Sequence, residues 1–386
     1  MKAASRPNTK GVLKMKKPSC TLLGLSVSWL LPFACGAAIS AFDSTSLLAQ
    51  SSAQEDSIIT SAEADHAAAQ EATVVFRHAK PANTPAGLAL KQKDIAAASG
   101  AATSTSEAGE GTATDNDGLR FPTDLSYLGG AVVRMAQSHP IYMLPNGKCP
   151  IATCWGNPES FLFDLGVSEF IHIVDQYTGL TANNRYTLGK HALMSYTPTP
   201  KTKPLTDMDI LGFVHKVASA TGQSGYGHIY HVFLPPGQDE CFTATDGRCY
   251  SPDVPQTFAF CGYHSSADFS DVVGHVLYTV EPFQDVPGCS VRPGTSNGQL
   301  GDSTYNTLSH ETFETITDPD GTAWFNFRAV SLAGAEIGDE CSFFKVISTP
   351  TTSQAFFDPS IFLIGIHRYG VQPEYANEEH ACATNP

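Results

Sequence analysis

The sequence predicts an α+β fold, organised as a single mixed domain with a central sheet and one helix that carries the candidate site residues. Strand-like and helix-like segments alternate beyond residue 119, and this part has roughly 265 residues, a size that one domain reaches. Hydrophobic residues make up 42% of the 386-residue chain, which is enough for a substantial core. Eight cysteines in the same part predict stabilising disulfides.

The first 38 residues are predicted to be a signal peptide, with Met15 as an alternative start. Basic residues surround Met15, and they precede the apolar run Thr21–Phe33 and the small residues Gly36-Ala37-Ala38. The apolar run is too short for a comfortable membrane span, so no transmembrane domain is expected. We expect a secreted protein, either extracellular or periplasmic.

Residues 39–118 are rich in Ala, Ser, Thr, Glu and Gln and contain few large apolar side chains. Such a composition buries too little surface to offset the entropy lost on ordering. This stretch is predicted to be a disordered spacer or pro-segment, with one weak strand at Thr73–Arg77. The domain is expected to span residues 119–386.

Within the domain, apolar spacing and turn residues predict the elements in order. Two short strands come first, and a helix interrupted at Gly166 follows them. A second amphipathic helix and two further strands precede the central helix, which Asp302 or Ser303 would cap and Pro319 would stop. The expected ranges are Gly130–Val133, Pro140–Leu144, Phe161–Tyr177, Asp207–Thr221, His228–Leu234, Val273–Val280, Asp302–Thr317 and, as a late strand or buried segment, Asp358–His367.

The cysteines are even in number once the two in the leader are set aside, which is typical of disulfides in exported chains. Cys149 with Cys154 and Cys241 with Cys249 are close enough in sequence to form short loops. Spacing alone does not give the other pairs. No Cys-x-x-Cys array is present, so a structural zinc ribbon is disfavoured.

The central helix contains a His-Glu-x-x-Glu cluster made by His310, Glu311 and Glu314. In a helix, His310 and Glu314 lie one turn apart on the same face, as two ligands of one metal ion must. Glu311 then faces the open side of the ion, where it would act as general base on a bound water. Glu336 and Asp339 are the candidates for the third ligand, with Glu336 favoured, because the arrangement is similar to that of zinc peptidases whose last ligand is a Glu (zincin-like).

A divalent metal ion is therefore the expected cofactor, with zinc favoured. Because Glu314 stands where such sites more often have a second His, one imidazole and two carboxylates would nearly neutralise the ion and weaken its Lewis acidity. Manganese or calcium remain alternatives. In a competing interpretation, the same residues lie on a solvated helix followed by the turn Asp318–Gly321.

Two further residues are candidates with open roles. His264 is assigned to the catalytic group, although it could also be a metal ligand or a hydrogen-bonded core histidine. Asp318 would orient His310 by a hydrogen bond, or simply belong to the turn after the helix. Glu281, near a strand end, is expected in a solvated loop.

Charge and missing motifs exclude several function classes. The chain has 23 Lys and Arg against 38 Asp and Glu, a formal net charge of -15, so no nucleic acid partner is expected. There is no phosphate-binding Gly-rich loop with a Lys.

Three segments in order resemble the phosphate-induced protein (EXORDIUM-like) family in its bacterial branch. They are Tyr127–Val133 with Ile141–Leu144, then His228–Leu234 with Phe260–Ser265, and finally Ser309–Pro319 with Trp324 and Glu336–Cys341. The resemblance covers most of Tyr127–Cys341, and its last block is the most specific. It implies an extracellular protein, since plant members are tied to cell-wall growth, and it implies no known substrate.

Together these observations predict a secreted metal-dependent hydrolase, foremost a metallopeptidase with Glu311 as general base, acting on a peptide or cell-wall substrate. The alternative is a non-catalytic extracellular or cell-wall-associated interaction protein with a structural metal ion or none. The oligomeric state stays open.

Overall fold

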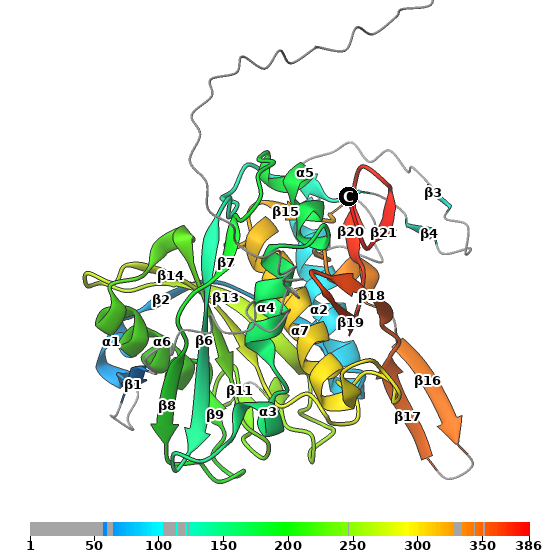
Figure 1. Cartoon of the computed structure of the whole chain (residues 1–386). Helices are drawn as coiled ribbons and strands as arrows, with labels where there is room; N and C mark the ends of the chain where they lie inside the picture. Colours follow the sequence, from blue (N-terminus) through cyan, green and yellow to red (C-terminus); the bar gives the residue numbers. More distant parts are fainter. Residues whose placement is uncertain are drawn as a thin grey trace, which may run out of the picture. The chain divides into compact units, whose positions relative to one another are not determined.

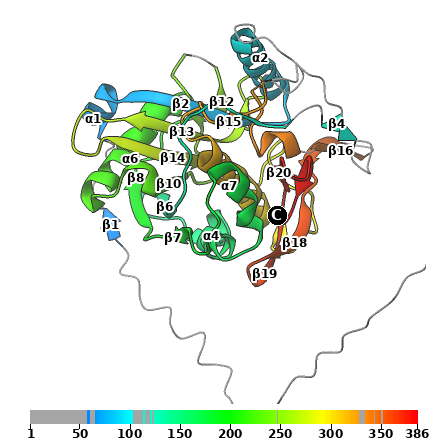
Figure 2. The ribbon, with the colours of Figure 1, turned by 90° about the horizontal axis from the view of Figure 1, so that it is seen from above.

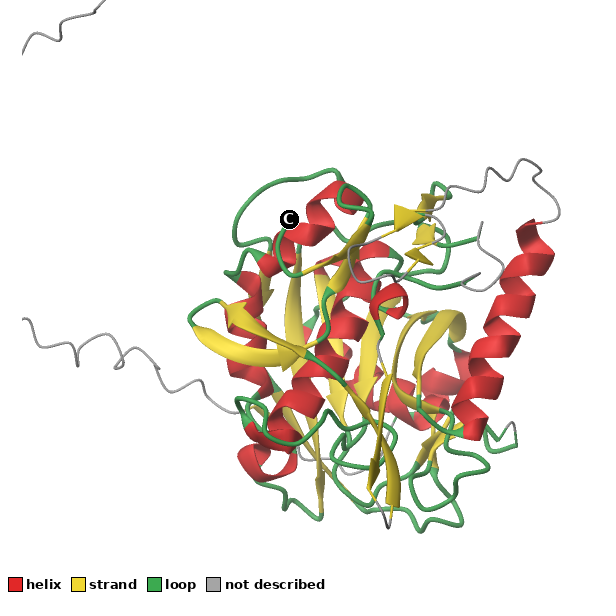
Figure 3. Cartoon of the chain, turned by 90° about the vertical axis from the view of Figure 1, so that its right-hand side faces the viewer, coloured by secondary structure: helices red, strands yellow, loops and turns green. Residues whose placement is uncertain are grey.

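A computed structural model describes residues 57–59, 65–102, 113–114, 120–121, 124–245, 247–327, 334–342, 344–349 and 352–386. All of them belong to one compact unit, Gln54–Pro386, built around a central mixed sheet with helices on both sides (Figures 1 and 3). The expected single mixed domain with a central sheet is thereby confirmed. The predicted signal peptide lies outside the described residues.

The central sheet is parallel except at one end. In spatial order its strands are β1 (Ser57–Ile59), β8 (Ala192–Tyr196), β6 (Ala136–Pro145), β10 (His228–Phe233), β14 (His275–Glu281), β13 (Phe260–Asp268) and β2 (Thr73–Pro81), and β7 (Tyr186–Leu188) also pairs with β6. Pairing is parallel from β1 to β14, while β13 runs antiparallel to both β14 and β2. Helices α3 to α5 lie between β6 and β7 along the chain and α6 lies between β8 and β10, so the fold is mixed α/β rather than the predicted α+β.

Two helical layers cover the sheet because alternate strand residues face opposite sides. Ile141 packs in the core with helix α6 (Asp207–Thr221), whereas its neighbour Tyr142 packs in a second core with α4 (Pro158–Gly166) and α7 (Gly298–Thr317). Figure 1 shows α6 on the left of the sheet and α4 with α7 on the right.

Helix α6 matches its predicted range residue for residue. A capping box formed by Thr206 and Asp209 begins it, and Gly222 in the left-handed region (φ 67°) ends it. The broken helix is also confirmed, since α4 ends at Gly166 and is followed by a 3-10 turn, η1 (Phe170–Val174), and α5 (Asp175–Thr178).

The central helix α7 ends at Thr317 as predicted but begins one turn before Asp302. The carboxylate of Asp302 does not cap the helix, because it accepts hydrogen bonds from the Asn297 side-chain amide and from the backbone amides of Asn297 and Gly370. Every residue of α7 from Gly301 to Thr317 is buried.

Two other segments differ from expectation. Gly130–Val133 is a loop rather than a strand, because the Gly130 amide bonds the Thr322 carbonyl at 2.9 Å and this close approach leaves no room for a side chain. Asp358–His367 contains a hairpin turn at Gly365, between β18 (Ser360–Ile364) and β19 (His367–Val371).

The predicted spacer is wrong for residues 65–102. They form α1 (His66–Glu71), β2 and α2 (Pro85–Ala102), and Ala69, Ala79, Ala82 and Leu90 belong to the core. The expected strand at Thr73–Arg77 is present and extends to Pro81. A segment with so few apolar residues is ordered here because it adds to a core that the rest of the chain supplies. Helix α2 lies on the opposite side of the molecule from α6 (Figure 2).

Short elements complete the fold. They are α3 (Ile151–Cys154), β3 (Ala113–Thr114), β4 (Arg120–Phe121), β5 (Ser126–Tyr127), β9 (Leu205–Thr206), η2 (Gly225–Gly227), β11 (Glu240–Cys241), β12 (Cys249–Tyr250), β15 (Trp324–Phe325), η3 (Asp339–Cys341), β16 (Phe344–Thr349), β17 (Thr352–Phe357), β20 (Glu374–Ala376) and β21 (Ala381–Ala383). No helix among the described residues is long and apolar enough to cross a membrane.

All eight cysteines of the domain form disulfides, including both expected short loops. The pairs are Cys149–Cys154, Cys241–Cys249, Cys261–Cys289 and Cys341–Cys382. Four disulfides are in keeping with export to an oxidising compartment.

Candidate metal centre

The structure brings the predicted site residues together from three elements. Helix α7 carries His310, Glu311 and Glu314, the segment leading into η3 carries Glu336 and Asp339, and β13 carries His264. A seventh residue, His78 on β2, completes what we call the site cluster. Its members are His78, His264, His310, Glu311, Glu314, Glu336 and Asp339.

Glu314 stands at the centre of the site cluster. Its Oε1 lies 3.0 Å from His310 Nε2, as the one-turn spacing on α7 predicts, and its Oε2 lies 3.4 Å from His264 Nδ1. Asp339 Oδ1 lies 3.8 Å from the same His310 nitrogen. The solvated-helix interpretation is therefore wrong, because the side chains of His310 and Glu314 are fully buried.

His264 faces carboxylates with both ring nitrogens. Nδ1 lies 3.6 Å from Glu311 Oε2, and Nε2 lies 3.6 Å from Glu336 Oε2. Neither nitrogen has hydrogen-bond geometry to a partner, although the ring is fully buried. A core histidine in a neutral setting would bond at least one nitrogen, so this ring is placed as part of the cluster.

Gln372 fixes the orientation of the His310 ring. Its Nδ1 lies 3.3 Å from Gln372 Oε1, which also accepts from the Lys80 ammonium at 3.0 Å, while Gln372 Nε2 donates to the Gly338 carbonyl at 2.6 Å. Because these partners make Gln372 Oε1 an acceptor, His310 Nδ1 carries the proton. His310 Nε2 then faces the carboxylates of Glu314 and Asp339.

His78 was not among the predicted site residues, because it lies in the stretch assigned to the spacer. Its Nε2 lies 2.6 Å from Asp339 Oδ2, and its Nδ1 lies 3.7 Å from Glu336 Oε1. The only local signal is the alternation Phe76, His78, Lys80 within the β-rich run 73–81, which would place these side chains on one face of a strand.

Asp318 does not orient His310. Its Oδ1 instead accepts from the backbone amides of Thr322 and Ala323, each at 2.7 Å, and so closes the turn after α7. Burial raises the pKa of this carboxyl to about 6. The turn interpretation of Asp318 is thus confirmed, and Gln372 takes the orienting role.

Burial and mutual charge shift the acid–base properties of the cluster. Burial raises the pKa of Glu311 and, more strongly, that of Glu336. For Glu314 the same burial is outweighed by His310 and His264, which hold its pKa well below the usual range. Burial alone would lower the pKa of His264, but the carboxylates of Glu336, Glu311 and Glu314 raise it to about 10.

Further buried charges surround the cluster. Burial lowers the pKa of Lys80 to about 8, although nearby carboxylates oppose the shift. Glu281 and Glu374 are fully buried, and burial raises the pKa of both. The expected solvated position of Glu281 is therefore wrong, since its strand ends inside the protein next to α7.

The donor atoms fit a divalent cation. Two ligands at 2.0–2.2 Å from one ion lie about 3.4 Å apart at the tetrahedral angle, and the separations of 3.0–3.8 Å given above bracket that value. Ligand atoms of His78, Glu314 and Asp339 lie within 4.8 Å of one another, as do those of His264, Glu311 and Glu314. Both carboxylate oxygens of Glu311 and of Glu314 are buried without a hydrogen bond, an arrangement that a cation would relieve.

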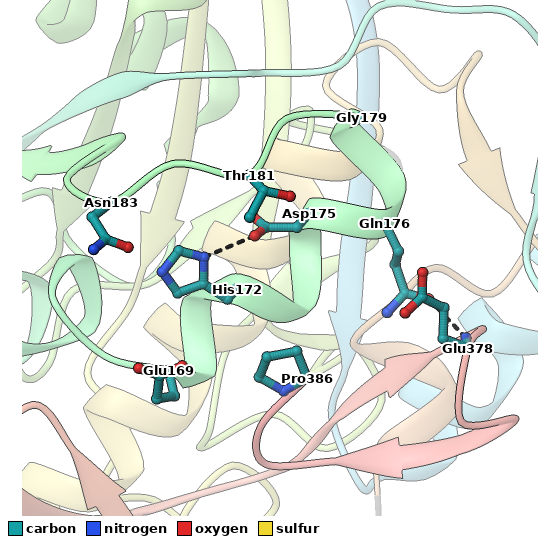
Figure 4. A pocket seen from close by; sticks show the side chains of 9 residues that line it. All are labelled: Glu169, His172, Asp175, Gln176, Gly179, Thr181, Asn183, Glu378 and Pro386. Carbon is teal, nitrogen blue, oxygen red and sulfur yellow. Dashed lines mark hydrogen bonds and ion pairs between the residues drawn. The ribbon is translucent and has the colours of Figure 1, made fainter. Parts of the chain in front are cut away.

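The site cluster is closed to solvent. The side chains of His264, His310, Glu311 and Glu314 are 0% exposed, whereas those of His78 and Asp339 are each 11% exposed. A separate surface hollow of about 570 Å³ lies beside η1 and α5, where His172 pairs with Asp175 (Figure 4). No member of the site cluster lines that hollow.

Comparison of the chain with known protein families, with curated proteins and with solved structures finds no match.

Proposed function

We propose that the protein is a secreted, metal-dependent peptidase whose ion is held by His310, Glu314 and Asp339, in the manner of zincins. The observation that supports it best is the position of His310 Nε2, which lies 3.0 Å from Glu314 Oε1 and 3.8 Å from Asp339 Oδ1 in a ring oriented by Gln372. A divalent cation held between these atoms would compensate the charge of the carboxylates. Zinc suits a site with imidazole and carboxylate ligands, and manganese or calcium are the alternatives.

In this proposal the chain's own residues move the proton. A divalent ion supplies Lewis acidity toward a water molecule and the peptide carbonyl. Glu311 accepts a proton from the water as its oxygen bonds to the carbonyl carbon, and it returns that proton to the leaving nitrogen as the C–N bond breaks. His264, held in its protonated form by the surrounding carboxylates, donates toward the negative charge that develops on the carbonyl oxygen.

We also propose that the chain belongs to the phosphate-induced protein (EXORDIUM-like) family. Support comes from the convergence of the most specific matching block, since the Ser309–Pro319 and Glu336–Cys341 segments meet at one point. An extracellular or periplasmic location is part of the same proposal.

One observation favours a second function. The near-complete burial of the cluster suits a structural ion in a non-catalytic extracellular interaction protein, because structural sites are closed whereas catalytic sites keep an open position. The two functions differ in what Glu311 does. A base is required only for hydrolysis.

Metal content and hydrolysis measured together test the proposal. We expect one equivalent of zinc, manganese or calcium by mass spectrometry of the purified protein, and its loss in Glu314→Gln. Glu374→Gln is the matched control, because this buried carboxyl of the same region lies outside both ligand groups and its loss should leave the ion in place. No metal in the wild type, even after reconstitution, would refute the proposal.

Glu311→Gln then separates the two functions. As a peptidase base, its loss should leave metal content unchanged and slow the cleavage of labelled, unfolded casein by about 10²–10⁴-fold. Bound metal with no cleavage by the wild type, tested after removal of any segment that covers the site, would favour the structural ion.

A further inference from the structure

Strand β2 occupies an edge of the sheet that directly adjoins the site cluster. It is the last strand of the sheet and pairs antiparallel with β13 from Pro81 opposite Phe260 to Thr73 opposite Asp268. The other edge of β13 pairs with β14. Without β2, the backbone donors and acceptors of β13 would form an open edge of the kind to which extended peptides add as a strand.

The register of β2 carries His78 directly onto the candidate ion site. His78 pairs with His264 across the two strands, and its Nε2 reaches Asp339 at 2.6 Å. Ligand atoms of His78, Glu314 and Asp339 lie within 4.8 Å of one another, so the His78 side chain would occupy a position at an ion held by Glu314 and Asp339 that a catalytic site keeps for water or substrate. His78 and Asp339 are also the most exposed members of the cluster, so the β2 side is the side nearest to solvent.

Two side chains that flank His78 on the same face of β2 enter formed pockets. The Phe76 ring packs so tightly on Gly321 that a Cβ on this glycine would lie 2.1 Å from it, and it contacts the His264 ring with centroids 5.5 Å apart. The Lys80 ammonium donates to Gln372 Oε1 at 3.0 Å and to the Asn306 carbonyl at 3.3 Å. Alternate side chains of one extended strand therefore contact three successive pockets.

We propose that the edge of β13 is the substrate-docking strand for an extended polypeptide, and that β2 is its intramolecular occupant, which keeps the site closed. The pockets of Phe76 and Lys80 accept an aromatic and a basic side chain on either side of the reacting position. This inference rests on the peptidase proposal for the chemistry, but the docking itself is independent of it.

The experiment uses the full-length chain with a recognition sequence for a specific protease inserted between Ala108 and Gly109, cut after folding. A synthetic peptide with the sequence of residues 73–81 is then added in excess. We expect the N-terminal fragment to separate on size-exclusion chromatography and the remaining part to keep its cooperative unfolding. Casein cleavage should rise at least about tenfold once the peptide too has been removed by dialysis, and it should fall again when the peptide is added back.

Peptide variants test the pockets without disturbing the fold. Phe76→Ala and Lys80→Ala peptides should bind the cut, fragment-free protein at least about tenfold more weakly than the parent peptide. A Val75→Ala peptide is the matched control, because this side chain is 43% exposed in the intact protein and should bind within about twofold.

Two results would overturn the inference. A remainder that fails to bind the 73–81 peptide, or one that unfolds on losing the fragment, would make β2 an integral strand. These outcomes are read from chromatography and unfolding, whereas failure of the peptidase proposal is read from the absence of metal. Peptide binding to a metal-free protein would uphold the docking strand and refute only the chemistry.

Discussion

His310 depends on two residues that are not candidates for chemistry. Gln372 fixes the ring by accepting from Nδ1, and Gly338 leaves space for the ring, since a Cβ at that position would lie 2.5 Å from Nδ1. The backbone at Gly338 has ordinary helical angles, so the reason for glycine is steric rather than conformational.

We predict that Gly338→Ala weakens metal binding by about 10–100-fold, because it displaces the ring that presents Nε2. Overpacking should also lower the free energy of unfolding by about 1–3 kcal/mol. Competition with a chelator and urea unfolding measure the two effects. Gly227→Ala serves as control, since a Cβ there meets nothing within 4 Å. Equal metal affinities in both variants would refute the steric role.

A second residue-scale prediction concerns acid stability. Burial lowers the pKa of His231 to about 3, and its Nδ1 bonds Thr279 Oγ1 at 2.8 Å. Between pH 6.5 and 3 the unfolded chain therefore binds more protons at this position than the native protein, so stability rises with pH in that window and falls on acidification.

We expect the contribution of His231 to lower the free energy of unfolding by about 2 kcal/mol between pH 7 and pH 5. His231→Asn should remove that part of the slope, as measured by urea unfolding at both pH values. At pH 8 the ring is neutral in both states, so unfolding there gives the variant's baseline stability. An unchanged slope would show that His231 titrates normally.

Residue types and helical spacing sufficed to predict His310, Glu311 and Glu314 as one group. Side chains four residues apart on a helix lie next to each other whatever the rest of the fold is. The sequence also pointed to His264, Glu336 and Asp339, although their distances to α7 depend on the tertiary fold. His78 and Gln372 could not be found, since nothing local marks a strand or loop residue that docks from a remote part of the chain.

At the scale of elements, α7 is unusual because a fully buried helix has a largely polar sequence. Most of its hydroxyls donate hydrogen bonds to backbone carbonyls of the same helix. Ser303, Thr304, Thr312, Thr315 and Thr317 each donate to the carbonyl four residues earlier. Thr307 differs, since its hydroxyl donates to Gln284 Oε1 at 2.9 Å. The helix can thereby present carboxylates inward while these six hydroxyls keep hydrogen-bond partners.

This difference gives a matched pair of variants. Thr307→Val should lower the free energy of unfolding by about 1–3 kcal/mol, because it leaves the buried Gln284 carbonyl oxygen without a hydrogen-bond donor. Thr312→Val should be close to neutral, since its acceptor already takes part in the helix. Urea unfolding of both variants decides the matter, and similar costs would contradict the assigned role of Gln284.

Elements with strong local signals were predictable and those without were not. Helix α6 has a capping sequence, a 3.6-residue period and a terminal glycine, so both ends followed from the sequence. Helix α2 and the end of β2 beyond Arg77 were missed, because their order depends on contacts with β13 and the core.

At the scale of the whole molecule, disulfides tie the C-terminal segment to the site. Cys341 ends η3, immediately after Asp339 and Glu340, and its partner Cys382 lies in β21. The Cys149–Cys154 pair closes a loop of only 5 residues, against 41 for Cys341–Cys382.

Loop-closure entropy predicts unequal costs for removing the two bridges. Replacing Cys341 and Cys382 by Ala should lower stability by about 4 kcal/mol, and replacing Cys149 and Cys154 by about 2 kcal/mol. Thermal unfolding of both double variants tests the order. If the short loop costs more, native-state contacts rather than chain entropy decide its contribution.

The class of sheet could not be read from the sequence because strand patterns do not identify partners. Strands β10 and β14 alternate as expected, yet only the fold shows that they pair in parallel across a crossover.

The pairing of β2 with β13 also determines when β2 can join the sheet during synthesis of the protein. Phe76 and its partner Ser265 are 189 residues apart, and ribosomes add about 5–20 residues per second, so β2 precedes its partner by roughly 10–40 s. During that interval the nascent strand has no sheet to join. Arg77, partly buried in the finished protein, and Lys80, fully buried there, then carry exposed charges that discourage strand-to-strand aggregation between growing chains.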